Sequence, residues 1–169
     1  MYPDTLFLHG ERGNILALRR FTEELGLVPE IDRIDLGKED FDPLEYDILF
    51  YGPGEISSFP AVMEDIGNYK RSLAEYIAAG HILLVTGATV AMFGERITRY
   101  DPAGQKGAGE IMEGLCVIPA YAVEREYVYG DDEWVAAEMN GKILNLIGNQ
   151  IHMADIDFNE CDGYRGFGR

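Results

Sequence analysis

Two glycine-containing loops, each placed after a short apolar segment, are the parts of this sequence best suited to chemistry. Gly52-Pro53-Gly54 follows the largely apolar segment 46–51 (YDILFY). Glycines at such a turn let backbone N–H groups approach an anion or a developing oxyanion, although an ordinary tight turn has the same composition. The second loop, residues 86–89, lies between the apolar residues 81–85 and a segment that ends at Gly94. A strand, a sharp turn and a helix in this order can present a nucleophile.

The second loop supplies few nucleophiles of its own. Gly87 and Ala88 carry none, and the hydroxyls of Thr86 and Thr89 need an activating base that is not evident nearby in the sequence. The sequence TGAT also occurs in nucleotide-binding turns of short-chain dehydrogenases. Here it lies late in the chain and lacks the further glycines of that motif, so we discount a dinucleotide site.

Histidine and cysteine give one further candidate. His152, in the segment GNQIHM (148–153), follows an apolar run and is the histidine best placed for a polar pocket; a structural role is the competing interpretation. Cys116 and Cys161 are too few for a disulfide framework, and neither lies in a Cys/His cluster. We therefore expect no metal site and no cofactor.

Length and charge restrict the class of partner. The 169 residues suit one compact domain with a core of its own. A formal net charge of -16 repels phosphate backbones and anionic lipids, which argues against nucleic acid and membrane partners. It suits a basic protein partner or simply high solubility. The sequence has no apolar run long enough to span a bilayer and no evident signal peptide, so the cytoplasm is the expected location.

The first half of the chain predicts alternating strands and helices. The apolar patterns favour strands at 5–9, 28–36, 46–51 and 81–85. Helices are expected at 15–26 and 60–79, with a turn at 10–14 and a short helix up to Gly94. The run 81–85 is of the continuous apolar kind that is covered on both faces of a sheet.

The second half predicts short strands at 116–123, 124–129, 134–139 and 142–147, separated by Gly, Asp and Asn turns such as 130–133. Together the two halves predict an α/β fold with a mostly parallel central sheet flanked by helices and an antiparallel, strand-rich C-terminal half. In such sheets ligands bind at the carboxyl ends of the strands. Loops 10–14, 52–56 and 86–90 are therefore the ones of interest.

Five segments of the sequence form a recognisable pattern: Tyr2-Pro3-Asp4, residues 10–20 (GERGNILALRR), residues 47–54 (DILFYGPG), Glu113-Gly114-Leu115 followed by Cys116, and residues 148–153, which include Gln150 and His152. Together they resemble the CobB/CobQ-like class I glutamine amidotransferases, and the nearest branch looks like the GatD-type glutaminase subunit of lipid II isoglutaminyl synthase. The first two segments resemble the opening of that family, and residues 47–54 match its oxyanion loop. Glu113-Gly114-Leu115 matches an EGLG segment, with Cys116 in place of the last glycine, and residues 148–153 are similar to a further family segment.

The resemblance implies a three-layer, flavodoxin-like fold and, for the family, glutamine amide hydrolysis. It also implies a Mur-ligase-like MurT partner, with which the GatD-type subunit amidates peptidoglycan precursors in the cytoplasm. Arg125 is the nearest match to a glutamine-binding arginine of the family, and Gln150 and His152 are further ligand-binding candidates.

Two departures from the family bear on activity. The family elbow reads roughly CGGYQLLG and this chain reads GATVAMFG at 87–94, so Gly87 falls where the nucleophilic cysteine belongs. The family continues to a Gly-Thr-Tyr-Leu-His stretch that bears its catalytic histidine, and this sequence ends at Arg169 before it. We therefore expect a single domain over 1–169 that is shortened at its C-terminal end relative to the family.

Three functions follow as hypotheses. The first is a degenerate amidotransferase-like domain without glutaminase activity that binds or regulates a partner such as a Mur-ligase-like protein. The second is an active enzyme with an altered nucleophile: Thr86, Thr89 or Cys116. The third is a small-molecule sensor that binds glutamine or a small anion between Gly54 and Gly87.

Overall fold

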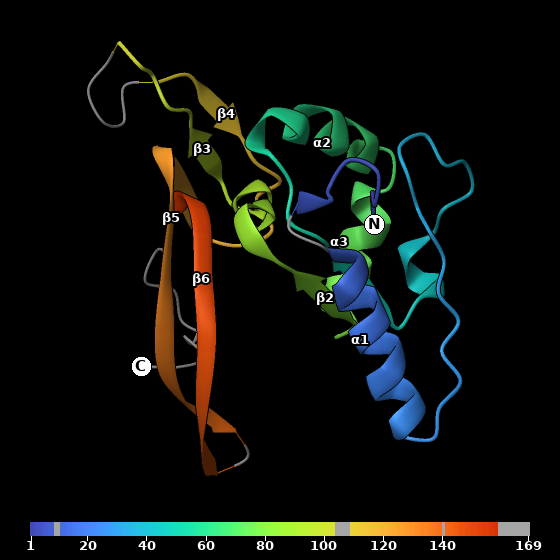
Figure 1. Cartoon of the computed structure of the whole chain (residues 1–169). Coiled ribbons are helices and arrows are strands. Elements are labelled where there is room, and N and C mark those ends of the chain that lie inside the picture. Colours follow the sequence, from blue (N-terminus) through green and yellow to red (C-terminus); the bar gives the residue numbers. More distant parts are fainter. Residues whose placement is uncertain (9–10, 104–108, 140, 159–169) are drawn as a thin grey trace. The chain divides into compact units, whose positions relative to one another are not determined.

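The computed structural model describes residues 1–8, 11–103, 109–139 and 141–158 (Figure 1). The chain divides into two compact units, Met1–Met92 and Phe93–Arg169. Helices and mixed sheets confirm the predicted α/β class. The three-layer, flavodoxin-like arrangement and the single-domain organisation stay predictions.

The sheet of the first unit has two parallel strands, β1 (Ile48–Tyr51) and β2 (Ile82–Val85). Both confirm strands predicted from continuous apolar runs. In their register Tyr51 lies opposite Val85, so the carboxyl ends of the two strands meet at one edge of the sheet. The expectation that β2 is covered on both faces is wrong, because Ile82 and Leu84, on one of its faces, are exposed.

Three α-helices accompany this sheet: α1 (Glu11–Glu24), α2 (Phe59–Gly67) and α3 (Lys70–Ala78). Residues 11–14, predicted as part of a turn, already belong to α1. The single helix predicted over 60–79 is two helices, because Tyr69 leaves the helical region of backbone space with φ -128° and ψ 18°. In the part of the chain that the structure describes, no helix combines the length and the apolar character needed to cross a membrane.

Two further predicted strands do not form. Residues 5–8 turn back on themselves, with the Leu6 N–H donating to the Tyr2 carbonyl, and residue 9 lies outside the described residues. Residues 28–36 have no strand partner among the described residues, and the Tyr2 N–H donates instead to the Ile34 carbonyl, which links this segment to the N-terminus. An alternating pattern forms a strand only where a neighbouring backbone completes the ladder, and Pro29 removes one donor from this segment.

A buried cluster of tyrosines holds β1 against the helices. The Tyr2 hydroxyl donates to Asp65 of α2 at 2.8 Å and shares a second hydrogen bond with the Tyr69 hydroxyl. The hydroxyls of Tyr51 and Tyr69 lie 3.3 Å apart. Burial raises the pKa of all three phenols above its ordinary value, so they stay protonated and remain available as donors near neutral pH.

The second unit is built on a four-stranded mixed sheet in the order β4-β3-β5-β6. Its strands are β3 (Arg96–Thr98), β4 (Ile111–Glu113), β5 (Ala120–Met139) and β6 (Lys142–Phe158). β3 pairs with β5 in parallel and with β4 antiparallel, and β5 and β6 form an antiparallel hairpin. Neither β3 nor β4 was predicted from the sequence.

The hairpin corrects the prediction of four short strands. β5 runs through residues 130–133, which were expected to be a solvated turn, and β6 runs through 148–153. Cross-strand pairing outweighs the local turn signal: Asp132 lies opposite Asn149, whose side-chain amide donates to the Asp132 carboxylate at 2.9 Å. The register of the ladder shifts between Glu124 and Tyr129.

Candidate functional site

The two loops singled out in the sequence lie together at the carboxyl edge of the β1–β2 sheet. The Thr86 N–H donates to the Tyr51 carbonyl at 3.1 Å, which extends the parallel pairing by one step. The Thr86 hydroxyl donates to the same carbonyl at 3.3 Å. Parallel pairing therefore brings Gly52-Pro53-Gly54 beside residues 86–89. Residues 11–14, the described part of the third loop of interest, are helical.

The side chain of Thr89 links residues 86–89 to the Gly52-Pro53-Gly54 loop by hydrogen bonds. Its side chain is fully buried, and its hydroxyl donates to the Gly52 carbonyl at 2.8 Å and accepts the Gly54 N–H at 2.9 Å. From the other side, the Leu8 N–H donates to the Pro53 carbonyl at 2.9 Å. The Gly54 N–H is the kind of donor that an oxyanion needs, and here a protein hydroxyl already accepts it.

Gly87 begins the turn after β2 in a conformation that favours glycine. Its φ is +63°, in the left-handed region, and it is the first residue of a 3₁₀ helix, Gly87–Phe93. A Cβ at this position would lie 2.7 Å from the Cβ of Pro53. The two loops are thus in direct contact at the point where a side chain on residue 87 would stand.

Gly54 is constrained in a similar way. A Cβ at this position would lie 2.3 Å from Cδ2 of Leu6, a fully buried side chain. The Gly-Pro-Gly loop is therefore packed tightly on the N-terminal segment as well as on the turn after β2. The hydrogen bonds and the glycine contacts together make this edge of the sheet a closely packed, ordered junction.

A second group of polar side chains lies on the hairpin of the other unit. Arg125 forms an ion pair with Asp155, and its guanidinium carbon lies 5.4 Å from the centre of the Tyr129 ring. The ring of His152 is 5.4 Å from that of Tyr129, and its Nε2 is 4.0 Å from Asp155. Nδ1 of His152 is buried and has no hydrogen-bond partner among the described residues.

Arg125 and His152 were separate ligand candidates in the sequence, and the antiparallel pairing brings them together. The sequence offered no means of finding Tyr129 and Asp155, because their role depends on the alignment of β5 with β6 across the register shift. Gln150, the third candidate, is exposed on β6 opposite Asp131. Its side chain points to the same face as that of His152, two residues away on the same strand.

Cys116 belongs to the second unit and is exposed. Its φ is +55°, and its sulfur lies 3.9 Å from the Gly114 carbonyl oxygen. Among the residues that the structure describes, no three His, Cys, Asp or Glu side chains gather closely enough to hold a metal ion.

Comparison with known proteins finds a curated relative, and no family model matches the chain. The chain is similar to the GatD subunit of lipid II isoglutaminyl synthase (glutamine-hydrolyzing) from Streptococcus pneumoniae (strain ATCC BAA-255 / R6). The two are 27% identical over 125 residues, which are 74% of this chain and 45% of the relative. The chain therefore spans less than half the length of the relative it matches. The GatD-like relationship predicted from the sequence is supported.

Proposed function

We propose that this chain is a GatD-like domain that binds a partner subunit and does not itself hydrolyse glutamine. The similarity to a subunit of a glutamine-hydrolysing synthase supports a role linked to amidation of a cell-wall precursor. The second part of the proposal rests on the match between the family's elbow segment and residues 87–94, which puts Gly87 at the position of the family's cysteine; in the structure Gly87 begins the turn after β2.

Glutamine hydrolysis, which we propose that this chain does not carry out, needs a thiolate. In class I glutamine amidotransferases the thiolate attacks the amide carbon, a glutamyl thioester forms and ammonia leaves. Glycine offers no atom for that bond. The packing of Pro53 against residue 87 also supports the proposal, because the space for a Cβ at this turn is already filled.

The neighbouring hydroxyls are poor substitutes. The Thr89 hydroxyl is fully buried and bonded to Gly52 and Gly54, so its proton and one of its acceptor sites are already in use. The Thr86 hydroxyl points to the Tyr51 carbonyl, which cannot act as a base. Activation of either hydroxyl would need a general base and a break in the hydrogen bonds that join the two loops.

The side chain of Arg125 already has a partner within the chain, Asp155. A glutamine-binding arginine must offer its guanidinium to the substrate carboxylate, whereas Arg125 is paired with Asp155 and packs on Tyr129. A free amino acid would have to compete with a carboxylate that the fold already supplies. The pairing favours a structural role for Arg125 in the hairpin.

The partner that we propose is a Mur-ligase-like protein. The relative is described as a subunit of a synthase, which implies that it acts with another chain. The net charge of -16 gives this chain a strongly negative surface, which would favour association with a partner that presents a basic face. We propose the cytoplasm as the place of this association.

The first test is glutamine turnover by the purified chain, measured as release of ammonia and glutamate. We expect the same rate as in buffer alone, both for the chain by itself and after addition of a purified Mur-ligase-like protein. A pneumococcal GatD sample serves as the positive control.

Two variants test whether another side chain acts as the nucleophile in this assay. Cys116→Ala and Thr86→Val each remove one alternative nucleophile, and we expect neither to change the background rate. Turnover above the buffer rate in the unaltered chain would overturn the proposal, and its loss in either variant would identify the altered nucleophile.

A further inference from the structure

The β5–β6 hairpin extends well beyond the rest of its sheet. In the part of the chain that the structure describes, β3 pairs with β5 at Tyr121, Ala122 and Val123. From Glu124 onward the described structure pairs β5 with β6 alone, and β6 has no second neighbour in the sheet order. A two-stranded ribbon is marginally stable in water, because half of its backbone groups lack a ladder partner. The length of this ribbon therefore calls for a further partner.

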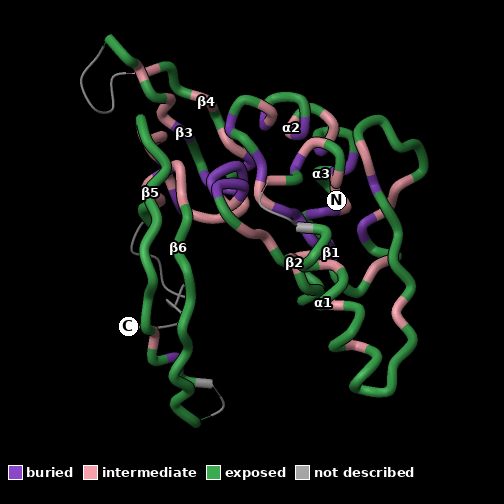
Figure 2. The backbone as a smooth tube through the Cα atoms, viewed as in Figure 1, coloured by how far each residue is buried: buried purple, intermediate pink, exposed green. Residues whose placement is uncertain are grey.

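Large apolar side chains are exposed on both faces of the ribbon. Trp134 and Ile147, which lie opposite each other, are 73% and 81% exposed. Ile143 and Ile151 share their face, and Leu144 and Leu146 are exposed on the other face. Figure 2 shows exposed residues along most of both strands. Exposed apolar surface of this extent is typical of an interaction site.

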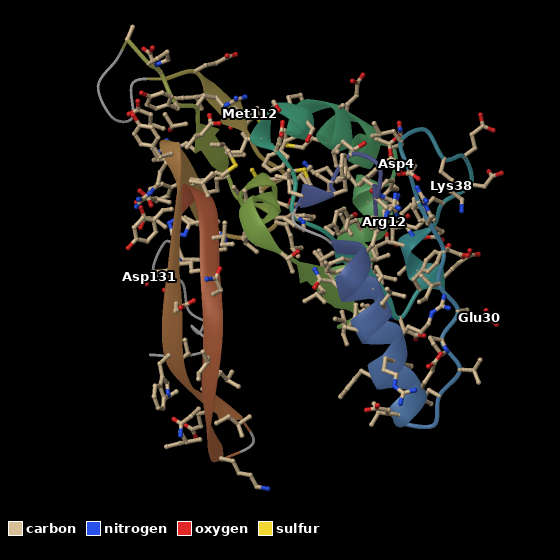
Figure 3. All side chains as sticks on the ribbon, viewed as in Figure 1. Asp4, Arg12, Glu30, Lys38, Met112 and Asp131 are labelled. Carbon is tan, nitrogen blue, oxygen red and sulfur yellow. The ribbon has the colours of Figure 1, made fainter. Side chains whose placement is uncertain are left out.

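Charge is distributed unequally between the two strands. β6 contains no Asp, Glu, Lys or Arg from residue 143 to residue 154. β5 carries Asp131, Asp132, Glu133 and Glu138, and Asp131 is labelled in Figure 3. Charged side chains protect an edge strand from pairing with another chain, and their absence leaves it open. The edge of β6 is therefore available for pairing with another strand, whereas the acidic side chains of β5 disfavour pairing at its edge.

We propose that two copies of this chain associate through β6, with the two β6 strands antiparallel and edge to edge. The hairpins of the two copies then form one continuous four-stranded sheet in the order β5-β6-β6-β5. The carboxylates of β5 lie on its two outer strands, away from the join, so like charges do not oppose each other across it. A basic partner would be drawn to β5, whereas the uncharged β6 matches a second copy of itself.

The hydrophobic pattern selects the register. Antiparallel strands related by a two-fold axis pair residues of the same face, and a register centred on Asn149 places Ile147 opposite Ile151 of the second copy. Trp134 then extends this apolar row across β5, since it lies opposite Ile147. Because each outer edge is acidic, pairing stops at two copies and yields a closed dimer rather than a filament.

The mass of the full chain in solution tests the association. Light scattering after size exclusion, over a dilution series, is expected to give twice the 18.9 kDa of one chain. Ile147→Lys, which puts a charge in the centre of the open edge, is expected to give a single chain. The matched control is Val28→Lys, at a 91% exposed apolar side chain of the first unit, and it is expected to remain a dimer.

Cysteine cross-linking tests the register, and it does so even if Ile147→Lys does not fold. In a chain with Cys116 and Cys161 changed to serine, Asn149→Cys is expected to form a disulfide-linked dimer on mild oxidation. Asn145→Cys, on the same strand and face, would lie roughly 27 Å from its counterpart in this register and is expected not to cross-link. A monomeric chain, species larger than two copies, a dimeric Ile147→Lys variant or cross-linking at 145 instead of 149 would each overturn the proposal.

Discussion

Replacement of Thr89 with valine is expected to lower the free energy of unfolding by about 2–6 kcal/mol. Valine preserves the shape of the side chain and removes the hydroxyl. The Gly52 carbonyl and the Gly54 N–H then lose a partner in a place that water does not reach, since Thr89 is fully buried. Each unsatisfied buried group costs about 1–3 kcal/mol. Urea denaturation followed by circular dichroism measures the difference.

The matched control for this change is Thr86→Val. The Thr86 hydroxyl makes one longer hydrogen bond, 3.3 Å, and its side chain is only partly buried. Its loss is expected to cost less than about 1 kcal/mol. Equal effects of the two substitutions would contradict the assignment of Thr89 as the residue that joins the loops.

Replacement of Gly87 with alanine is the second change expected to have a large effect, a destabilisation of about 2–5 kcal/mol. A residue with a Cβ is strained at a φ of +63°, at a cost of about 1–2 kcal/mol. The new Cβ would in addition stand 2.7 Å from the Cβ of Pro53, so the Gly-Pro-Gly loop must move. Thermal or urea unfolding measures the loss.

The variant Gly26→Ala separates the cost of backbone strain from the cost of the close contact with Pro53. Gly26 also has a positive φ, +78°, but a Cβ there would meet nothing within 4 Å. Its replacement is therefore expected to cost only the backbone strain. If Gly87→Ala is no more destabilising than Gly26→Ala, the close contact between the turn after β2 and Pro53 is not a real constraint.

The part of the fold that could be predicted from the sequence is the part set by local pattern. β1 and β2 are short apolar runs bounded by glycine, and these signals are sufficient to place both strands and the loops that follow them. Once the strands were expected to be parallel, the proximity of Gly52-Pro53-Gly54 to residues 86–89 followed as well. α1 was similarly evident from its apolar spacing, and the same signal predicted one helix where α2 and α3 form.

The parts that could not be predicted depend on contacts between segments distant in the sequence. Residues 130–133 have the composition of a turn, and they extend β5 because β6 offers polar partners across the ladder. The clustering of Arg125 with His152 requires the same pairing. Thr89 was considered as a nucleophile, and its actual hydrogen bonds become visible only when the two loops are seen together.

The central claim is that the turn after β2 carries no nucleophile for glutamine hydrolysis, and covalent labelling tests it most directly. The chain is incubated with a glutamine-like diazo ketone, which alkylates the active thiolate of a glutaminase, and the intact mass is then recorded with and without excess glutamine. We expect no adduct that glutamine prevents. A glutamine-protected adduct that maps to Thr86, Thr89 or Cys116 would contradict the assignment of this chain as a non-hydrolysing binding domain.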